Sequence, residues 1–124
     1  MDRDLMADVG VVVSILSVFF VIAIFMSREV KMANYKMVTC ADGFTVSIQA
    51  GRGNYCEPRM DGYNAYESVE LGFPNRPCIF IKDYAEDPRD LTGTVYGYVP
   101  AHIVKKMIAA HGGIVSGECP PLAG

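Results

Sequence analysis

The feature that most constrains this chain is an uncharged apolar run at residues 9–26, VGVVVSILSVFFVIAIFM. As a helix, a run of this length extends about 27 Å, close to the roughly 30 Å hydrocarbon core of a bilayer. The preceding residues 1–8 form an acidic N-terminus with a single Arg3, and they lack the basic region of a cleaved signal peptide. The run therefore predicts one N-terminal transmembrane helix.

The residues after this run predict its orientation. Arg28, Lys31 and Lys36 lie in a basic juxtamembrane linker at residues 27–36. Because basic residues favour the cytoplasmic side, we expect the N-terminus outside a bacterial inner membrane and the domain at 37–124 in the cytoplasm. In that orientation the cysteines are reduced thiols.

Two methionines leave a second interpretation open. Translation starting at Met32 or Met37 would give a cytoplasmic protein without the apolar run. The triplet Arg28-Glu29-Val30, just upstream, is encodable by a purine-rich string that resembles a bacterial ribosome-binding site. In that case the first 31 residues are a mis-annotated extension, and the membrane contact through 9–26 disappears.

Residues 37–124 are enough for one small domain with its own core. The Asp-Gly pair in CADG, residues 40–43, favours a tight turn between two β-rich segments, and apolar residues alternate with polar ones through 44–50. Helical spacing follows Pro100 over residues 101–111. The remaining β-like segments are 66–73, 78–81, 94–99 and 114–116. The sequence thus predicts an α+β fold, with a small antiparallel sheet of four or five strands, one packed helix and the preceding transmembrane helix.

The charge balance and the cysteines exclude some functions. Acidic residues outnumber basic ones in the domain, so we expect no nucleic-acid partner. The even number of cysteines permits disulfides only in an oxidising compartment, and their spacing matches no zinc motif. The four are Cys40, Cys56, Cys78 and Cys119.

A long loop dense in Gly, Pro, Asn and Asp is the main candidate site. It reads GRGNYCEPRMDGYN, residues 51–64, and long ordered loops in small domains often carry function. Its glycines follow a strand but precede no helix, so neither nucleotide fingerprint is met and we expect no cofactor. Tyrosine and arginine suit a binding surface. The predicted binding residues are Arg52, Asn54, Tyr55, Cys56, Arg59, Tyr63 and Tyr66, so the contact surface spans residues 52–66.

Cys56 is the only catalytic candidate that the sequence offers. Arg52 and Arg59 would lower its pKa if they approached it, and a histidine of the helix would supply the base. The alternative is that Cys56 packs as a small apolar residue while Arg59 pairs with Glu67 or Glu70.

The two histidines predict no metal site. His102 and His111 are nine residues apart in the predicted helix, so they point to opposite faces. We expect His102 to be exposed, and the ring of His111 to cap the last helical turn. Without closely spaced ligand pairs, no metal is predicted.

Several spaced strings resemble small uncharacterised accessory proteins of tailed bacteriophages. They are FTVSIQAGRGNYCEPR, YESVELGFP, GTVYGYVP and IVKKMIAAHGG, and the resemblance covers about residues 37–117. It implies an accessory protein without assigned catalytic residues. We therefore expect a non-enzymatic binding module that acts on a host or phage protein at the cytoplasmic side. The alternatives are a small cysteine-dependent enzyme using Cys56 and a membrane-anchored structural component.

Overall fold

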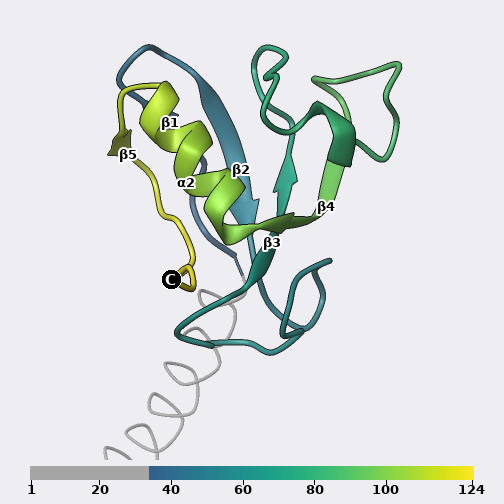
Figure 1. The fold of residues 1–124 in the computed structure, drawn as a ribbon, viewed down its shortest axis with the longest axis vertical. Coiled ribbons are helices and arrows are strands. Elements are labelled where there is room, and N and C mark those ends of the chain that lie inside the picture. Colours follow the sequence, from purple (N-terminus) through teal and green to yellow (C-terminus); the bar gives the residue numbers. More distant parts are fainter. Residues whose placement is uncertain (1–33) are drawn as a thin grey trace, which may run out of the picture. The chain divides into compact units, whose positions relative to one another are not determined.

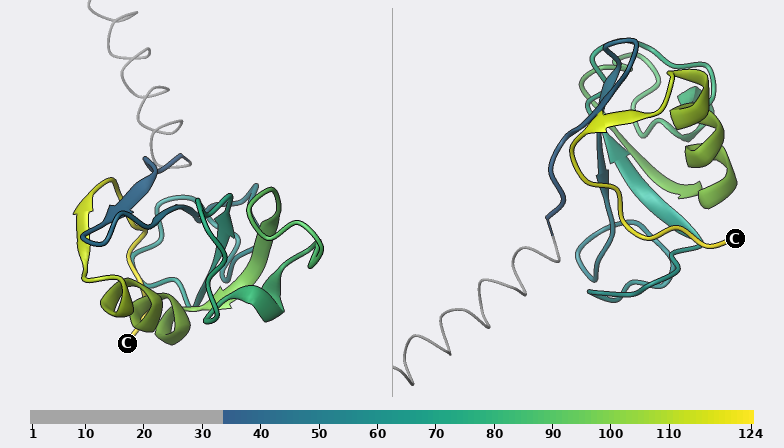
Figure 2. Two further views of the ribbon diagram at one scale, coloured as in Figure 1. Left: turned by 90° about the horizontal axis from the view of Figure 1, so that it is seen from above. Right: turned by 90° about the vertical axis from the view of Figure 1, so that its left-hand side faces the viewer.

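The computed structural model describes residues 34–124, in which five antiparallel strands and one α-helix surround a single core (Figures 1 and 2). The strand order across the sheet is β4-β3-β2-β1-β5. The elements are β1 (Val38–Cys40), β2 (Thr45–Gln49), β3 (Ser68–Gly72), the 3₁₀ turn η1 (Lys82–Tyr84), β4 (Val95–Pro100), α2 (Ala101–Ala110) and β5 (Ile114–Ser116). The structure confirms the predicted α+β domain: within these residues it shows five strands, where four or five were expected, and one α-helix.

The first hairpin forms where the Asp-Gly pair predicted it. Cys40 N–H donates to Phe44 O at 2.8 Å, and Gly43 adopts a φ of +88°, which glycine reaches without steric cost. The alternation in β2 also holds, because Phe44, Val46 and Ile48 are all buried. The turn therefore fixes the register that places this apolar face inward.

Helix α2 joins the two edges of the sheet. It begins directly after β4, with Pro100 as its N-cap, and it ends before β5, which pairs with β1. Val104 and Met107 are buried against the sheet, with Ile103 and Ile108 partly buried beside them. Figure 2 (left) shows α2 lying along one side of the core, where the apolar stripe predicted it.

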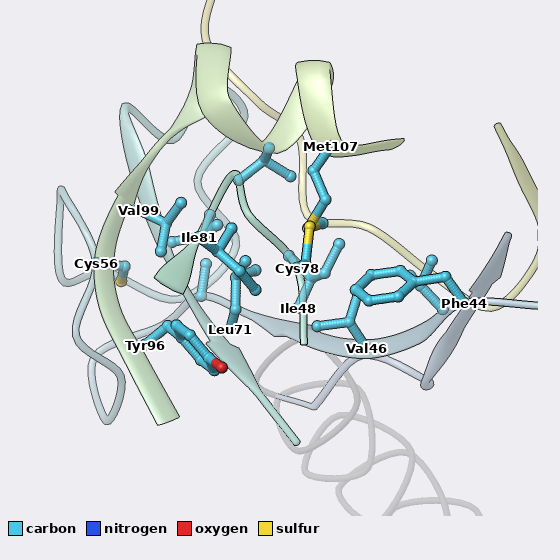
Figure 3. Packing of buried hydrophobic residues seen from close by; sticks show 14 of the residues in the cluster. Phe44, Val46, Ile48, Cys56, Leu71, Cys78, Ile81, Tyr96, Val99 and Met107 are labelled. Atoms are coloured by element: carbon cyan, nitrogen blue, oxygen red, sulfur yellow. The ribbon is translucent and has the colours of Figure 1, made fainter. Parts of the chain in front are cut away.

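The core is a continuous cluster of buried aliphatic and aromatic side chains with three cysteines (Figure 3). Figure 3 shows Cys56 near one end of the cluster and Phe44 at the other, with Cys78 between them. Tyr66 and Tyr96 are the largest side chains that are fully buried. These two rings thus supply much of the apolar area that stabilises a domain of this size.

The predicted fold class needs one correction. It joined the α+β domain to a transmembrane helix, but among residues 34–124 no helix has the length and apolar character needed to cross a membrane. The predicted span, 9–26, lies outside the described residues. The fold class is therefore corrected to an α+β domain without a membrane helix in this part of the chain.

A second correction concerns residues 78–81, which the sequence predicts as a strand. They form a turn that leads into η1, with Ile81 N–H donating to Cys78 O at 3.2 Å. Pro74 and Pro77 lack the N–H groups that a sheet ladder requires, so the chain leaves the sheet after β3. The short apolar run is buried through Cys78 and Ile81 without strand pairing.

Candidate functional site

The 52–66 loop connects two neighbouring strands, β2 and β3, at one end of the sheet (Figure 1). Two carboxylates fix its path. Glu70 of β3 accepts hydrogen bonds from Tyr55 N–H (3.0 Å) and from Asn54 Nδ2 (3.3 Å). Asp61 accepts one from Arg52 N–H (3.0 Å) and pairs with the Arg52 guanidinium at 3.0 Å. The backbone of the loop is thus bonded to one acidic side chain of its own, Asp61, and to one of the neighbouring strand, Glu70.

Cys56 lies inside this loop and is fully buried. Its Sγ accepts from Gly51 N–H (3.3 Å) and donates to the carbonyl oxygens of Gly51 (3.2 Å) and Pro58 (3.4 Å). Burial raises the pKa of the thiol, and the attraction of Arg59 opposes this rise only in part. No histidine contacts Cys56 within residues 34–124. These contacts are typical of a structural thiol. The buried Cys56 sulfur is therefore not accessible as the nucleophile of a cysteine-dependent enzyme, the alternative function that the sequence left open.

Tyr66 also serves the interior of the loop. Its ring is fully buried, its hydroxyl donates to Met60 O at 2.5 Å, and it accepts from Tyr63 N–H at 3.1 Å. Its backbone N–H donates to Pro121 O at 2.9 Å, so the C-terminal tail holds it from the other side. Of the seven predicted binding residues, Cys56 and Tyr66 are therefore supports, and Asn54 is tied to Glu70.

The exposed members of the predicted set include Tyr55, Arg59 and Tyr63. Tyr55 is 43% exposed, and the Arg59 guanidinium lies over its ring, 5.7 Å from the centroid. Arg59 forms no ion pair with Glu67 or Glu70, contrary to the alternative prediction for this arginine. Met60, next in the chain, is exposed as well. Side chains of these types are enriched at the centres of protein interfaces.

Tyr98 of β4 joins this surface, and sequence reasoning missed it. Its ring lies 5.8 Å from that of Tyr55, and its N–H donates to Tyr55 O at 3.0 Å. Strand alternation would turn Tyr98 inward with the buried Tyr96. Instead its φ of +54° turns the ring outward, beside an irregularity in the β3–β4 register, and it is 45% exposed. We call Tyr55, Arg59 and Tyr98 the Tyr55 face.

Tyr55 packs directly on β4 through a glycine. A Cβ added at Gly97 would approach Tyr55 Cβ to 3.2 Å, which is tighter than ordinary contacts. The Gly-Tyr pair at residues 97–98 is therefore the one sequence signal for this surface, since glycine in a strand often marks a close approach of another segment.

The histidines lie elsewhere. His102 is exposed, as predicted. His111 is the C-cap of α2, but its backbone N–H, not its ring, satisfies the last helical turn, bonding to Met107 O and Ile108 O. Its ring instead lies between Asp42 and Cys78. These two residues bond opposite ring nitrogens, and no group of three potential ligands within residues 34–124 is placed to hold a metal ion.

All four cysteines are free thiols. Burial raises the pKa of Cys40, and it raises the pKa of Cys119 to about 11. Among the four, only Cys78 has a histidine at hydrogen-bond distance within the described residues.

Comparison of the chain with protein-family models, with curated proteins and with solved structures finds no match in any of the three.

Proposed function

We propose that residues 34–124 form a phage-type accessory module that binds a host or phage protein through the Tyr55 face, a binding role that itself requires no catalysis. The observation that carries the proposal is the exposure of Tyr55 and Arg59, on a loop whose polar groups are bonded to Glu70, beside the exposed ring of Tyr98 on β4. Tyrosine and arginine contribute strongly to binding energy in interfaces. A preformed loop also reduces the conformational entropy that is lost on binding.

The chemistry of the face narrows the kind of partner. Within residues 34–124 the Arg59 guanidinium has no carboxylate partner, so it is available to an acidic group. The two rings offer apolar area with hydroxyl groups at their edges. The partner is thus a protein surface with a carboxylate beside an apolar pocket. The acidic net charge of the chain, −3, supports a protein over a nucleic acid.

The backbone of Tyr98 gives a second line of support. A left-handed conformation at a bulky residue costs about 1–3 kcal/mol, and such positions cluster at functional sites. This conformation directs the ring of Tyr98 into solvent beside Tyr55. In the proposed module this ring is held ready for the partner.

The proposed place of action is the bacterial cytoplasm. Four free thiols suit a reducing compartment. The resemblance to tailed-bacteriophage accessory proteins supports the same setting, in which the partner is a host or phage protein.

A site-specific photo-cross-linking experiment tests the proposal. A photoreactive phenylalanine replaces Tyr63, an exposed residue of the same 52–66 loop, or Val115 on β5, and the full chain is produced in the natural bacterial host. The cross-linked protein is identified by mass spectrometry, and its affinity for the purified chain is measured by calorimetry. We expect a discrete cross-link from position 63 and none from position 115.

Alanine variants then locate the contact. Tyr55→Ala and Arg59→Ala are each expected to weaken binding at least about tenfold, or about 1.4 kcal/mol, while Val115→Ala and Lys106→Ala leave it unchanged. Thermal unfolding of all four should match that of the wild type. Equal cross-linking from both positions, or undiminished affinity of the Tyr55 and Arg59 variants, would exclude this face.

A further inference from the structure

Three chemically active side chains meet at the end of the sheet away from the 52–66 loop (Figure 1). Asp42 lies in the β1–β2 turn, Cys78 lies in the segment between β3 and η1, and His111 caps α2. Asp42 N–H donates to His111 O at 3.2 Å, which ties the turn to the helix end. We call this region the turn end, and the 52–66 loop with Tyr98 the loop end.

The side chains form one hydrogen-bonded series. His111 Nε2 lies 3.6 Å from Cys78 Sγ, and His111 Nδ1 lies 2.6 Å from Asp42 Oδ2. The same carboxylate accepts from Arg76 (2.9 Å) and, through Oδ1, from Phe44 N–H (2.9 Å). A thiol, an imidazole and a carboxylate in this order are the parts of a nucleophile, its base and the group that orients the base.

Asp42 sets the tautomer of the ring. The hydrogen bond from His111 is the main cause that holds the pKa of Asp42 below its usual range, and the Phe44 N–H contributes further. An ionised carboxylate only accepts hydrogen bonds, so Nδ1 carries a proton, and in the neutral ring Nε2 then presents its lone pair to Cys78. The ring nitrogen that faces the thiol is therefore a base.

Packing fixes the orientation of the ring. The imidazole stacks on Phe44, with centroids 3.9 Å apart and planes 5° from parallel. Phe44 is itself buried, so the ring rests on the core. Base and support are thus in place before any substrate binds.

We propose that Cys78 and His111 are catalytic residues, and Asp42 a positioning residue, of a site that hydrolyses carboxylic esters of slim, apolar acyl groups. The site lies apart from the Tyr55 face and stands independently of the binding function proposed above. The series of contacts from Cys78 through His111 to Asp42 and the stacking of the His111 ring on Phe44 support this assignment.

The reaction balances without any redox step. His111 Nε2 takes the thiol proton, Cys78 Sγ forms a bond to the acyl carbon, and the ester C–O bond breaks as the Nε2 proton passes to the leaving alcohol. Water then attacks the acyl-Cys78 thioester while His111 takes its proton, the C–S bond breaks, and the proton returns to sulfur. The backbone N–H groups of Ile79 and Phe80 have no acceptor within residues 34–124, so they are available to stabilise the oxyanion.

The exposed fractions of Cys78 and of the two residues that follow it determine which esters the proposed site accepts. Cys78 is only 5% exposed, so a slim acyl group reaches the sulfur more readily than a branched one. Ile79, the next residue, is 77% exposed, and Phe80 is also exposed. These two side chains offer apolar contact to an acyl chain that enters beside Cys78.

The test uses the full chain and three p-nitrophenyl esters: the acetate, the butyrate and the branched pivalate. We expect p-nitrophenol release with the acetate and the butyrate, and a rate at least tenfold lower with the pivalate. Intact mass and peptide mapping of a quenched reaction should place a single acyl group on Cys78. Acylation spread over Cys40, Cys78 and Cys119, or absent from Cys78, overturns the proposal. This test needs only the wild-type chain.

Variants assign the roles. Cys78→Ser and His111→Asn should each lower the rate at least a hundredfold, while Cys119→Ser, the matched thiol control, keeps it. Asp42→Asn should lower the rate at least tenfold and Asp42→Glu should restore part of it, a rescue that a merely structural role does not predict. Equal rates in the two Asp42 variants overturn its positioning role, and an unchanged rate in folded His111→Asn overturns the base. The Lys106→Ala variant, at an exposed position of α2, should keep full esterase activity.

Discussion

Cys56 at the loop end and Cys78 at the turn end are both buried, and the neighbours of these two thiols differ in kind. Cys56 forms hydrogen bonds only with backbone groups, those of Gly51 and Pro58. Cys78 contacts an imidazole whose other nitrogen is bound by a carboxylate. Both residues are buried, so burial alone does not distinguish a structural thiol from a reactive one. What distinguishes them is whether a basic group lies at hydrogen-bond distance and can remove the proton from the thiol.

The same comparison holds for the polar groups at each end. At the loop end, Glu70 and Asp61 bond to the backbone and hold a shape. At the turn end, Asp42 bonds to a side chain that itself bonds to a third. The hydrogen bonds at the loop end therefore suit the proposed binding surface. Those at the turn end suit the proposed proton transfer from Cys78 to His111.

The largest effect that separates the two ends should come from Tyr66→Ala. The change removes a fully buried ring and the hydroxyl that holds Met60 and Tyr63, so we expect a loss of about 3–5 kcal/mol in the free energy of unfolding. Urea unfolding measures it. Tyr66→Phe keeps the ring and should cost about 1–2 kcal/mol.

Exposed Tyr63→Ala is the matched control for this change and should stay within about 0.5 kcal/mol of the wild type. A Tyr66→Ala chain as stable as Tyr63→Ala would mean that the 52–66 loop does not depend on the buried ring. The loop end would then not be a preformed surface.

The second effect, at the turn end, depends on pH. Because the folded pKa of Asp42 lies below its unfolded value of about 4, its contribution to stability is present above that pH and is lost as the pH falls through the folded pKa. The stability difference between wild type and Asp42→Asn should therefore be constant from neutral pH to about 5 and shrink below about 4. Denaturant unfolding at several pH values measures this difference. A difference that is the same at pH 3 and pH 7 would contradict a stabilising role for the Asp42 carboxylate, which bonds His111 and Arg76.

The smallest effect concerns one left-handed aromatic residue at each end. Phe73, just after β3, has a φ of +51°, and Tyr98 has a φ of +54°. Glycine relieves this strain, so Phe73→Gly should raise the free energy of unfolding by up to about 1 kcal/mol. Tyr98→Gly should change it less, because it also loses the contact with Tyr55. Thermal unfolding compares the two, and a larger gain from Tyr98→Gly would show that its ring contributes nothing to the loop end.

Local patterns in the sequence predicted most of the fold. The Asp-Gly turn, the alternation through 44–50 and the helix after Pro100 each depend on residues close together in the chain, and each is present. The prediction failed at residues 78–81, where an apolar run suggested a strand although flanking prolines remove the N–H groups that pairing needs. Tyr98 was missed because alternation assumes regular strand dihedrals, which its positive φ breaks.

The sites were harder to predict than the fold. The 52–66 loop stood out by composition, but the side chains that face inward could not be separated from those that face outward, so Cys56 and Tyr66 were grouped with Tyr55. At the turn end, 33 residues separate Cys78 from His111, and 69 separate Asp42 from His111. No local sequence pattern predicts that these three residues lie together, because their contact depends on α2 crossing the sheet and ending beside the first hairpin.

The contact of Tyr66 with the C-terminal tail has a consequence for how the chain is made. Tyr66 N–H donates to Pro121 O, and Ala123 N–H donates back to Tyr66 O at 2.8 Å. Lys105 of α2 also bonds Ala123 O at 2.7 Å. On the ribosome, residues 121–123 emerge long after the 52–66 loop that they secure. During synthesis the loop therefore lacks this support until residues 121–123 have left the exit tunnel, and the proposed binding surface is complete only then.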